Sequence, residues 1–302
     1  MDKQTNFEVI IIGGSYAGLS AAMSLGRSLR SVLVIDSGLP CNRQTPHSQN
    51  FLTHDGHTPG QIMAEARGRL IKYNTIKFHN DLAVSSENTD HGFTVTTRTG
   101  EVFSAQKLIF ATGIKDIMPD IPGFSDCWGI SVIHCPYCHG YEYRKEKTAI
   151  LANGAKAYHL ASLINNLTDN LTLLTNGRAE FDFPAAEKLK ANSIGITEKE
   201  VAEIMHEDGY VKEIVFTDGS REAFTAVYAA LPFEQHSDIP AALGCAFTEH
   251  GYIQVDTMQK TTVDGVFACG DNAVMMRSVA NAVALGNVTG AIVNKELVDE
   301  RF

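Results

Sequence analysis

The start of the chain holds the pattern that most restricts how it can fold. A short, mostly apolar run, Glu8–Ile12, leads into the glycine-rich segment Gly13–Gly18, and residues 19–29 follow with apolar side chains on one face. A second apolar run, Val32–Ile35, ends at Asp36. Short apolar runs that end at turn residues are typical of buried strands, and the stretch between them has a helical period. The pattern therefore predicts a strand–helix–strand unit of the dinucleotide-binding type.

The glycine-rich turn gives the physical reasons for this interpretation. Gly13 permits a tight turn after the strand, and Gly18 permits close contact between helix and strand. A pyrophosphate would lie at the helix N-terminus, and Asp36 would accept hydrogen bonds from ribose hydroxyls. One position departs from the G-x-G-x-x-G pattern, because Ser15 stands at its middle glycine. A backbone turn can still form with serine there, so nucleotide binding is the expected function.

A second motif, His134-Cys135-Pro136-Tyr137-Cys138-His139, indicates redox chemistry. Proline is favoured at the first position of a helix, which puts Cys135 at or near the N-cap. Backbone N–H groups there stabilise a thiolate, which is the nucleophilic form of cysteine. Cys138 follows about one helical turn later, close enough to bridge to Cys135. His139 is a candidate proton shuttle, because the ordinary pKa of histidine, about 6.5, is near neutrality.

Plainer interpretations of these residues stay open. A Cys-x-x-Cys pair is half of a structural zinc site, but such a site needs four ligands and the chain has no second pair. For His139, the alternative to proton transfer is a purely structural role. The histidines at positions 47, 54 and 57 lie in a loop without matching ligands. We therefore expect no metal site.

The order of further motifs predicts how the chain is divided into domains. A strand pattern at Lys107–Ala111 ends in the small turn Ala111–Gly113, and a second strand–helix–strand pattern begins at Thr148–Leu151. The tail returns to the first pattern, with a strand that ends in Gly270-Asp271 before a long helix. We therefore predict an α/β fold with two Rossmann-like nucleotide-binding domains, the second inserted into the first. The predicted bounds are 1–114 with 247–302 for the first domain and 115–246 for the second.

Composition and charge narrow the classes of partner. The chain has 302 residues, of which 44% are apolar and 20% charged, as in an ordinary globular protein. A net charge of −10 argues against a nucleic-acid partner, which favours a basic face. The N-terminus lacks the pattern of a signal peptide, and no apolar run approaches the roughly 20 residues of a membrane helix. We therefore expect a cytoplasmic protein without a membrane partner.

Four motifs together carry a resemblance to a known family. The segments GGSYAGLSAA, ATG, CPYC and GVFACGD occur in this order along the chain. In this order and spacing they resemble the low-molecular-weight thioredoxin reductase family of FAD-dependent pyridine-nucleotide disulfide oxidoreductases. The variant CPYCHGYE, with GGSYAG at the start, is similar to a branch that includes dithiol oxidases of the fungal gliotoxin oxidase type. The resemblance covers essentially the whole chain and implies a homodimer.

The resemblance implies that the first domain binds FAD. The implied cofactor-binding residues are Gly13, Gly14, Ser15, Tyr16, Ala17, Gly18, Asp36, Asn50, Ala111, Thr112, Gly113, Gly270, Asp271, Arg277, Ser278 and Val279. By this resemblance Asn50 lies near the flavin ring, Asp271 binds the ribityl chain and Arg277 lies at its pyrimidine end. A cation and a helix N-terminus there would stabilise negative charge on reduced flavin. A plainer role for Asp271, as a turn or N-cap residue, stays open.

The second domain departs from the NADPH site that the resemblance implies. Ala152 stands where the first glycine of G-x-G-x-x-A is expected, although Gly154 and Ala157 remain. After the second strand the family has an arginine-rich stretch that binds the 2′-phosphate, but residues 175–178 contain only Arg178 as a cation. No acid is placed to bind the ribose of NADH. Binding of NAD(P)H by the second domain is therefore an open question.

Three functions follow from these expectations. In the leading hypothesis, electrons pass from NAD(P)H to FAD, then to Cys135–Cys138, and then to the disulfide of thioredoxin or of a small molecule. In the family the second cysteine faces the flavin and the first meets the substrate, with His139 placed to move the proton. The second hypothesis reverses the flow, so that a substrate dithiol is oxidised and oxygen reoxidises the flavin. The third is a redox-sensing flavoprotein without turnover.

Overall fold

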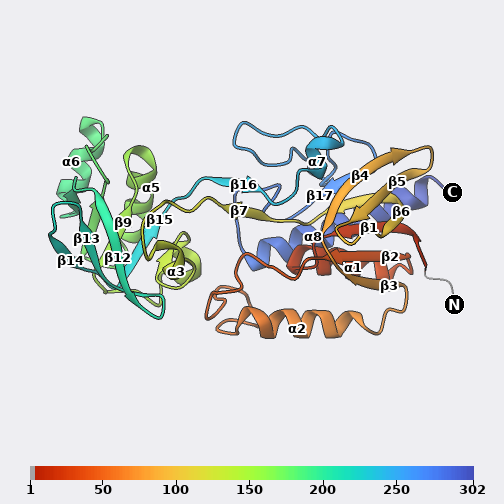
Figure 1. Cartoon of the computed structure of the whole chain (residues 1–302), viewed down its shortest axis with the longest axis horizontal. Helices are drawn as coiled ribbons and strands as arrows, with labels where there is room; N and C mark the ends of the chain where they lie inside the picture. The colour runs from red at the N-terminus through yellow and green to blue at the C-terminus, as the bar shows by residue number, and fades with distance from the viewer. Residues whose placement is uncertain (1–3) are drawn as a thin grey trace. The chain divides into compact units, whose positions relative to one another are not determined.

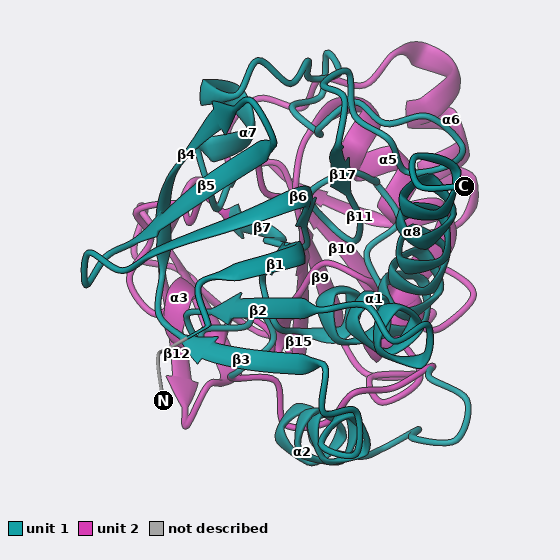
Figure 2. Ribbon diagram, turned by 90° about the vertical axis from the view of Figure 1, so that its right-hand side faces the viewer, with its two compact units in different colours: residues 1–43, 51–115, 233–302 teal, residues 44–50, 116–232 magenta. Residues whose placement is uncertain are grey.

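The computed structural model describes residues 4–302, which form two compact units. Unit 1 comprises the described residues up to Arg43, Phe51–Lys115 and Phe233–Phe302. Unit 2 comprises Gln44–Asn50 and Asp116–Pro232, as Figure 2 shows in a second colour. The chain passes from unit 1 to unit 2 and back along two short paired strands, β7 (Ile114–Asp116) and β16 (Phe233–Gln235).

The bounds of the units differ from the predicted domain bounds at Lys115, which belongs to unit 1, and in two longer stretches. Residues 233–246 were expected in the inserted domain but belong to unit 1. The reason is apolar burial, because Ile239 and Leu243, in and after helix α7 (Ile239–Ala242), lie in the core of unit 1. Residues 44–50 were expected in the first domain but pack with unit 2. Their side chains contact Trp128 and Gly129 there, since Gln44 donates a hydrogen bond to the Trp128 carbonyl.

Unit 1 is built on a seven-stranded sheet in which only β5 runs opposite to β1, so that β5 pairs antiparallel with both β4 and β6 and every other pairing is parallel. Its strands are β1 (Asn6–Ile12), β2 (Val32–Asp36), β3 (Ile76–Asn80), β4 (Ala83–Thr89), β5 (Gly92–Thr97), β6 (Val102–Phe110) and β17 (Val266–Ala268). The order is β3-β2-β1-β6-β5-β4 (Figure 1). On its far edge β6 pairs first with β5 and then, from Leu108 onward, with β17. The carboxyl ends of β1, β2, β6 and β17 therefore meet at one edge of the sheet.

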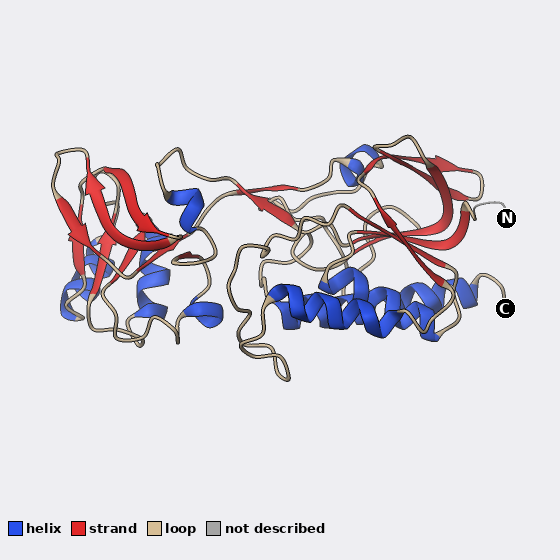
Figure 3. Ribbon diagram, turned by 60° about the horizontal axis from the view of Figure 1, so that its bottom comes forward, coloured by secondary structure: helices blue, strands red, loops and turns tan. Residues whose placement is uncertain are grey.

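Helices cover one face of this sheet (Figure 3). They are α1 (Tyr16–Arg27), α2 (Pro59–Leu70) and α8 (Val279–Asp299). Helices α1 and α8 lie very close together, because a Cβ built on Gly286 would be 2.1 Å from the Ala17 carbonyl oxygen. Small residues along α8 are therefore required by this packing. On the other face, β4, β5 and α7 enclose the second apolar core of unit 1.

Unit 2 repeats the parallel arrangement on a smaller scale. Its five-stranded parallel sheet has the order β11-β10-β9-β15-β8. The strands are β8 (Val132–Ile133), β9 (Thr148–Leu151), β10 (Leu171–Leu174), β11 (Gly195–Thr197) and β15 (Ala226–Ala229). A three-stranded antiparallel sheet adds β12 (Val201–Glu207), β13 (Tyr210–Phe216) and β14 (Arg221–Ala223). The helices are α3 (Phe124–Cys127), α4 (Pro136–His139), α5 (Gly154–Ile164) and α6 (Phe183–Ala191).

The predicted fold class is confirmed. Both predicted strand–helix–strand units are present, as β1-α1-β2 and as β9-α5-β10. Among residues 4–302 there is no helix both long and apolar enough to span a membrane.

Candidate functional site

The carboxyl ends of four parallel strands form the first candidate site, in unit 1. Gly13 follows β1 with φ of +104°, and a Cβ on it would be 2.3 Å from the Ala111 carbonyl oxygen. A Cβ on Gly18 would be 1.9 Å from the Gly13 carbonyl oxygen. The turn therefore has no room for side chains at either position, as the sequence predicted. Gly270, after β17, lies against the same turn, with its Cβ position 3.1 Å from the Ala17 Cβ.

The first turn of α1 faces this edge without a side-chain cap. Its N-cap residue is Ser15, whose side chain makes no capping hydrogen bond. Its hydroxyl points instead toward Met63, with Oγ 3.8 Å from Sδ. The turn also holds no acidic side chain. Backbone N–H groups at a helix N-terminus that lack a side-chain acceptor are a binding site for an anion such as a pyrophosphate.

Asp36 makes a structural contact that the sequence analysis did not predict. The Gly14 amide donates a hydrogen bond to Asp36 Oδ1 at 3.1 Å. A Cβ on Gly14 would be 2.8 Å from the Asp36 Cβ, so only glycine leaves room for this approach. The carboxylate thus lies directly beside the glycine-rich turn, where it can fix the turn and accept a further hydrogen bond with Oδ2.

Asn272 is a site residue that the sequence analysis missed. It is completely buried, and its Nδ2 donates to the Phe110 carbonyl at 2.9 Å and to Thr112 Oγ1 at 3.2 Å. These bonds join the end of β6 to the loop after β17. Within residues 4–302 the Asn272 Oδ1 has no hydrogen-bond partner. A bound group with a hydroxyl donor would satisfy it, and the signal in the sequence was the polar residue directly after Gly270-Asp271.

The segment before α8 brings three further predicted residues together. Arg277 Nε lies 3.5 Å from Asp271 Oδ2, so these two side chains form an ion pair. Ser278 is the N-cap of α8 and accepts a hydrogen bond from the Asn281 amide at 3.1 Å. Asp271 is therefore not the N-cap of this helix.

Asn50 is the predicted cofactor residue that the structure separates from the others. It has a φ of +58° and lies at the end of Gln44–Asn50, which packs with unit 2. The other predicted cofactor residues all belong to unit 1. The pattern Gln49-Asn50-Phe51 gave no signal for this difference, because it depends on the contacts of the segment with Trp128 and Gly129.

The cysteine pair forms the second candidate site, in unit 2. Cys135 is the N-cap of α4 and Pro136 occupies the first helical turn, as predicted. Cys135 and Cys138 are joined by a disulfide, and their Cα atoms are 5.3 Å apart. The Cys138 amide also donates to Cys135 Sγ at 3.1 Å. This N–H would stabilise a thiolate at Cys135 once the disulfide is reduced.

The rest of unit 2 holds the cysteine pair in place from both sides. Before it, Ile133 of β8 pairs with Tyr228 of β15. After it, Gly140 lies so close to Leu167 that a Cβ would be 2.5 Å from Leu167 Cδ1. Tyr143 donates a hydrogen bond to the Ile130 carbonyl at 2.8 Å, and burial raises the pKa of Tyr143 to about 12.

Side chains next to the cysteine pair differ in exposure. His139 is partly buried, and this burial lowers the pKa of its imidazole below the ordinary value. The imidazole is therefore neutral at pH 7 and able to accept a proton. Tyr137 and Tyr141 are 67% and 68% exposed, and the Arg144 guanidinium lies 4.0 Å from the centre of the Tyr141 ring. A substrate that approaches α4 would thus meet two aromatic rings and a cation.

The histidines outside α4 form contacts of another kind. His54 stacks on Phe51 at 5.6 Å between ring centres and meets the edge of His57 at 5.2 Å. Its Nε2 lies 3.5 Å from Glu65 Oε2. No group of three His, Cys, Asp or Glu side chains in the described part of the chain is placed to hold a metal ion.

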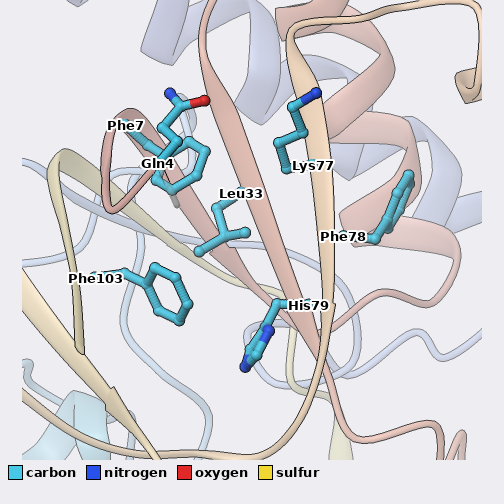
Figure 4. A pocket seen from close by; sticks show the side chains of 7 residues that line it. All are labelled: Gln4, Phe7, Leu33, Lys77, Phe78, His79 and Phe103. Carbon is cyan, nitrogen blue, oxygen red and sulfur yellow. The ribbon is translucent and has the colours of Figure 1, made fainter. Parts of the chain in front are cut away.

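A pocket of about 220 Å³ lies in unit 1, away from the glycine-rich turn (Figure 4). It lies toward the amino ends of β1, β2 and β6 and along β3, away from the edge that carries the glycine-rich turn. None of the predicted site residues lines it. The lining residues are Gln4, Phe7, Leu33, Lys77, Phe78, His79 and Phe103.

Comparisons with known proteins match nearly the whole chain. The family model for pyridine nucleotide-disulphide oxidoreductases matches residues 7–286. The thioredoxin reductase tcpT of Claviceps purpurea is 32% identical over 99% of this chain and 96% of its own length. The crystal structure of an oxidoreductase from Agrobacterium tumefaciens is 36% identical, with a TM-score of 0.92 over 97% of this chain and 99% of that one. The crystal structure of HlmI is 30% identical, with a TM-score of 0.92 over 99% of this chain and 95% of that one.

Proposed function

The chain belongs to the pyridine nucleotide-disulphide oxidoreductase family, and from this premise we propose that it is an FAD-dependent thiol–disulfide oxidoreductase. The observation that carries the proposal is the disulfide between Cys135 and Cys138 at the start of α4. It places an exchangeable disulfide beside a backbone N–H that stabilises the thiolate of Cys135.

The residues of unit 1 fit an FAD molecule. The uncapped start of α1 would receive the pyrophosphate, and Asp36 would accept hydrogen bonds from the adenosine ribose. The unpartnered Oδ1 of Asn272 would accept one from a hydroxyl of the ribityl chain, and Asp271 and Arg277 would lie at the flavin end. FAD supplies a reversible two-electron acceptor when bound. The further residues proposed to hold it are Gly13, Gly14, Ser15, Tyr16, Ala17, Gly18, Asn50, Ala111, Thr112, Gly113, Gly270, Ser278 and Val279.

The cysteine pair exchanges with a substrate dithiol in two steps. A substrate thiolate attacks Cys135 Sγ, the Cys135–Cys138 bond breaks, and Cys138 leaves as a thiolate. The second substrate thiolate then attacks its own sulfur in the mixed disulfide, and Cys135 leaves as a thiolate. The substrate is oxidised to a disulfide, and its two electrons are now on the cysteine pair. The same steps in reverse reduce a substrate disulfide.

His139 moves the protons of this exchange. Its neutral imidazole accepts a proton as a thiol becomes a thiolate, and returns it when a thiolate is protonated. The lowered pKa that burial produces keeps this base available down to below pH 6.5. By the family resemblance Cys138 would face the flavin and Cys135 the substrate. The hydrogen bond from the Cys138 amide stabilises the Cys135 thiolate that leaves in the second step.

Two substrates and two directions are compatible with this chemistry. Relatives named thioredoxin reductases support thioredoxin, or another disulfide, as the acceptor of electrons from NAD(P)H. A specific observation in unit 2 favours the opposite direction, in which a small dithiol is oxidised. There the side chain of Asn153 accepts hydrogen bonds from the amides of Gly154 and Glu180, in the turn where a nicotinamide nucleotide would have to bind. A homodimer, as the resemblance implies, would be checked by light scattering of the purified protein.

Steady-state assays test the proposed function. The holoprotein is mixed in air with a small dithiol, and peroxide is measured; separately, it is mixed with NADPH or NADH and an oxidised thioredoxin. We expect turnover in at least one assay and none in a Cys135→Ser variant that keeps its flavin. A holoprotein that turns over no thiol or disulfide in either assay would contradict the proposal and leave the redox-sensor hypothesis.

A further inference from the structure

The loop after β10, residues 175–181, lies over the first turn of α5 and is held there by one side chain. Asn153, the N-cap of α5, accepts hydrogen bonds at Oδ1 from the amides of Gly154 and Glu180, both at 2.9 Å. Its Nδ2 donates to the Arg178 carbonyl at 2.8 Å. A single amide group thus joins the helix N-terminus to two residues of the loop.

The far end of the loop is held as well. Glu198 accepts from the Ala179 amide through Oε1 at 2.8 Å, and from the Gly177 amide through its carbonyl at 3.1 Å. Asn176 Oδ1 accepts from the Val201 amide at 2.7 Å. The amides of Gly177, Ala179 and Glu180 therefore already have acceptors within the protein. They are not available to the 2′-phosphate or ribose of a nucleotide.

Glu180 also fills the space above Gly154, the glycine that a phosphate would have to approach. Gly154 has a φ of +59°, as expected in a phosphate-binding turn. The three atoms nearest to a Cβ built there all belong to Glu180, namely its carbonyl oxygen at 3.6 Å, its Cβ at 3.9 Å and its Oε2 at 4.0 Å. A pyrophosphate at this turn would meet a carboxylate, and like charges repel.

The two strand–helix turns of the chain therefore differ in the property that matters for anion binding. At α1 the Ser15 side chain makes no capping hydrogen bond, and the neighbouring Asp36 carboxylate accepts from the Gly14 amide, which precedes the helix. At α5 the Asn153 side chain caps the helix, and Glu180 covers it. Two cations near this second turn, Lys156 and Arg178, are exposed, and neither side chain has a hydrogen bond or ion pair within residues 4–302. Ala152 and Arg178, where the sequence departs from the family's NADPH site, thus lie at a turn that loop 175–181 covers.

We infer that loop 175–181 closes the nucleotide site of unit 2, so that neither NADPH nor NADH binds there. The consequence rests on the proposed function: a substrate dithiol reduces the cysteine pair, and dioxygen is the terminal oxidant. For each dithiol oxidised, dioxygen takes two electrons and two protons and leaves as hydrogen peroxide. Asn153 holds the loop against the start of α5 by its hydrogen bonds. Glu180 occupies the space next to Gly154.

Nucleotide binding to the oxidised holoprotein tests this inference without any thiol chemistry. Equilibrium dialysis with NADPH, NADH and adenosine 2′,5′-bisphosphate is compared for the wild type and for an Asn153→Ala/Glu180→Ala variant. We expect no saturable binding to the wild type, and affinity for NADPH raised at least about tenfold in the variant. A Glu203→Ala variant, which removes an exposed carboxylate from β12, should behave as the wild type.

Three outcomes would overturn the inference. Saturable NADPH binding to the wild type at micromolar concentration shows an open site, and it leaves the proposed thiol–disulfide activity intact. A variant that keeps its fold by circular dichroism and gains no affinity shows that Asn153 and Glu180 do not close the site. Hydrogen exchange gives a second measurement, because the Glu180 amide should be protected in the wild type and should lose protection in Asn153→Ala. Fast exchange of this amide in the wild type would also contradict the closure.

Discussion

Two residues in this protein have roles that depend on features the sequence can only suggest. Gly18 is required because the backbone of its own turn leaves no room for a Cβ. His139 is the proposed base because burial lowers the pKa of its imidazole. Each argument concerns a single residue, and each gives a prediction that a substitution at that residue can test.

Replacing Gly18 by alanine should destabilise unit 1 and release the flavin. The added Cβ would be 1.9 Å from the Gly13 carbonyl oxygen, and relief requires a shift of the glycine-rich turn. We expect a loss of about 1–3 kcal/mol or more in the free energy of unfolding, with a lower ratio of flavin to protein absorbance. Gly68→Ala in α2 is the control, because no atom lies within 4 Å of its Cβ position. It should stabilise the protein slightly, by about 0.5–1 kcal/mol, and an equal loss in both variants would refute the argument.

The pH dependence of activity should report His139. Its imidazole must be neutral to accept a proton, so kcat/KM for a dithiol should fall only below a pKa that is lower than 6.5. His139→Gln should lose this acid limb and lower kcat by roughly 10²–10⁴-fold. An unchanged limb in the variant would assign the titration to another group.

The same burial links His139 to stability. A histidine whose pKa is lowered in the folded state binds fewer protons folded than unfolded between that pKa and about 6.5. Stability should therefore decrease as the pH falls through this window. In His139→Gln the free energy of unfolding should lose that part of its pH dependence, as urea titrations at several pH values would show.

At the level of elements, the carboxyl ends of β1, β2, β6 and β17 create the proposed FAD site, and the N-termini of α1 and α8 complete it. Much of this followed from the sequence, because Gly13–Gly18 and Gly270-Asp271 each end an apolar strand pattern. Asn272 did not, since its role depends on β17 pairing with the second half of β6. Pairing between strands far apart in the chain depends on the tertiary structure, so no local sequence pattern predicts it.

The cap of α8 should matter for flavin binding beyond its effect on stability. Ser278→Ala removes the hydrogen bond from the Asn281 amide, and loss of such a cap costs about 1 kcal/mol. Thr58→Ala removes a comparable cap from α2, where Thr58 Oγ1 accepts from the Gln61 amide. Urea unfolding should show similar losses for both variants. Only Ser278→Ala should also weaken FAD binding in fluorescence titrations of the apoprotein, and equal FAD affinity in the two variants would place the α8 N-terminus outside the site.

At the level of the whole molecule, the order of motifs predicted two Rossmann-like units, and both are present. The bounds were harder to predict, because residues 233–246 contribute apolar side chains to the core of unit 1 and residues 44–50 pack against Trp128 and Gly129 of unit 2. Such contacts depend on which surfaces meet, and a sequence pattern does not contain them. The contacts of the loop over α5 were equally hard to predict. Ala152 and Arg178 indicated that the nucleotide site of unit 2 is weakened, but the hydrogen bonds by which Asn153 holds the loop are seen only in the structure.

The central claim is that Cys135–Cys138 and a flavin form one electron-carrying system in this chain. Anaerobic titration of the oxidised holoprotein with dithionite, followed by flavin absorbance, counts the electrons that each molecule takes up. The account predicts about four electrons per flavin in the wild type, two for the disulfide and two for the flavin. It predicts about two in a Cys135→Ser/Cys138→Ser variant, and full flavin reduction by a substrate dithiol in the wild type alone. Equal uptake in both proteins, or flavin reduction by the dithiol without the cysteines, would contradict it.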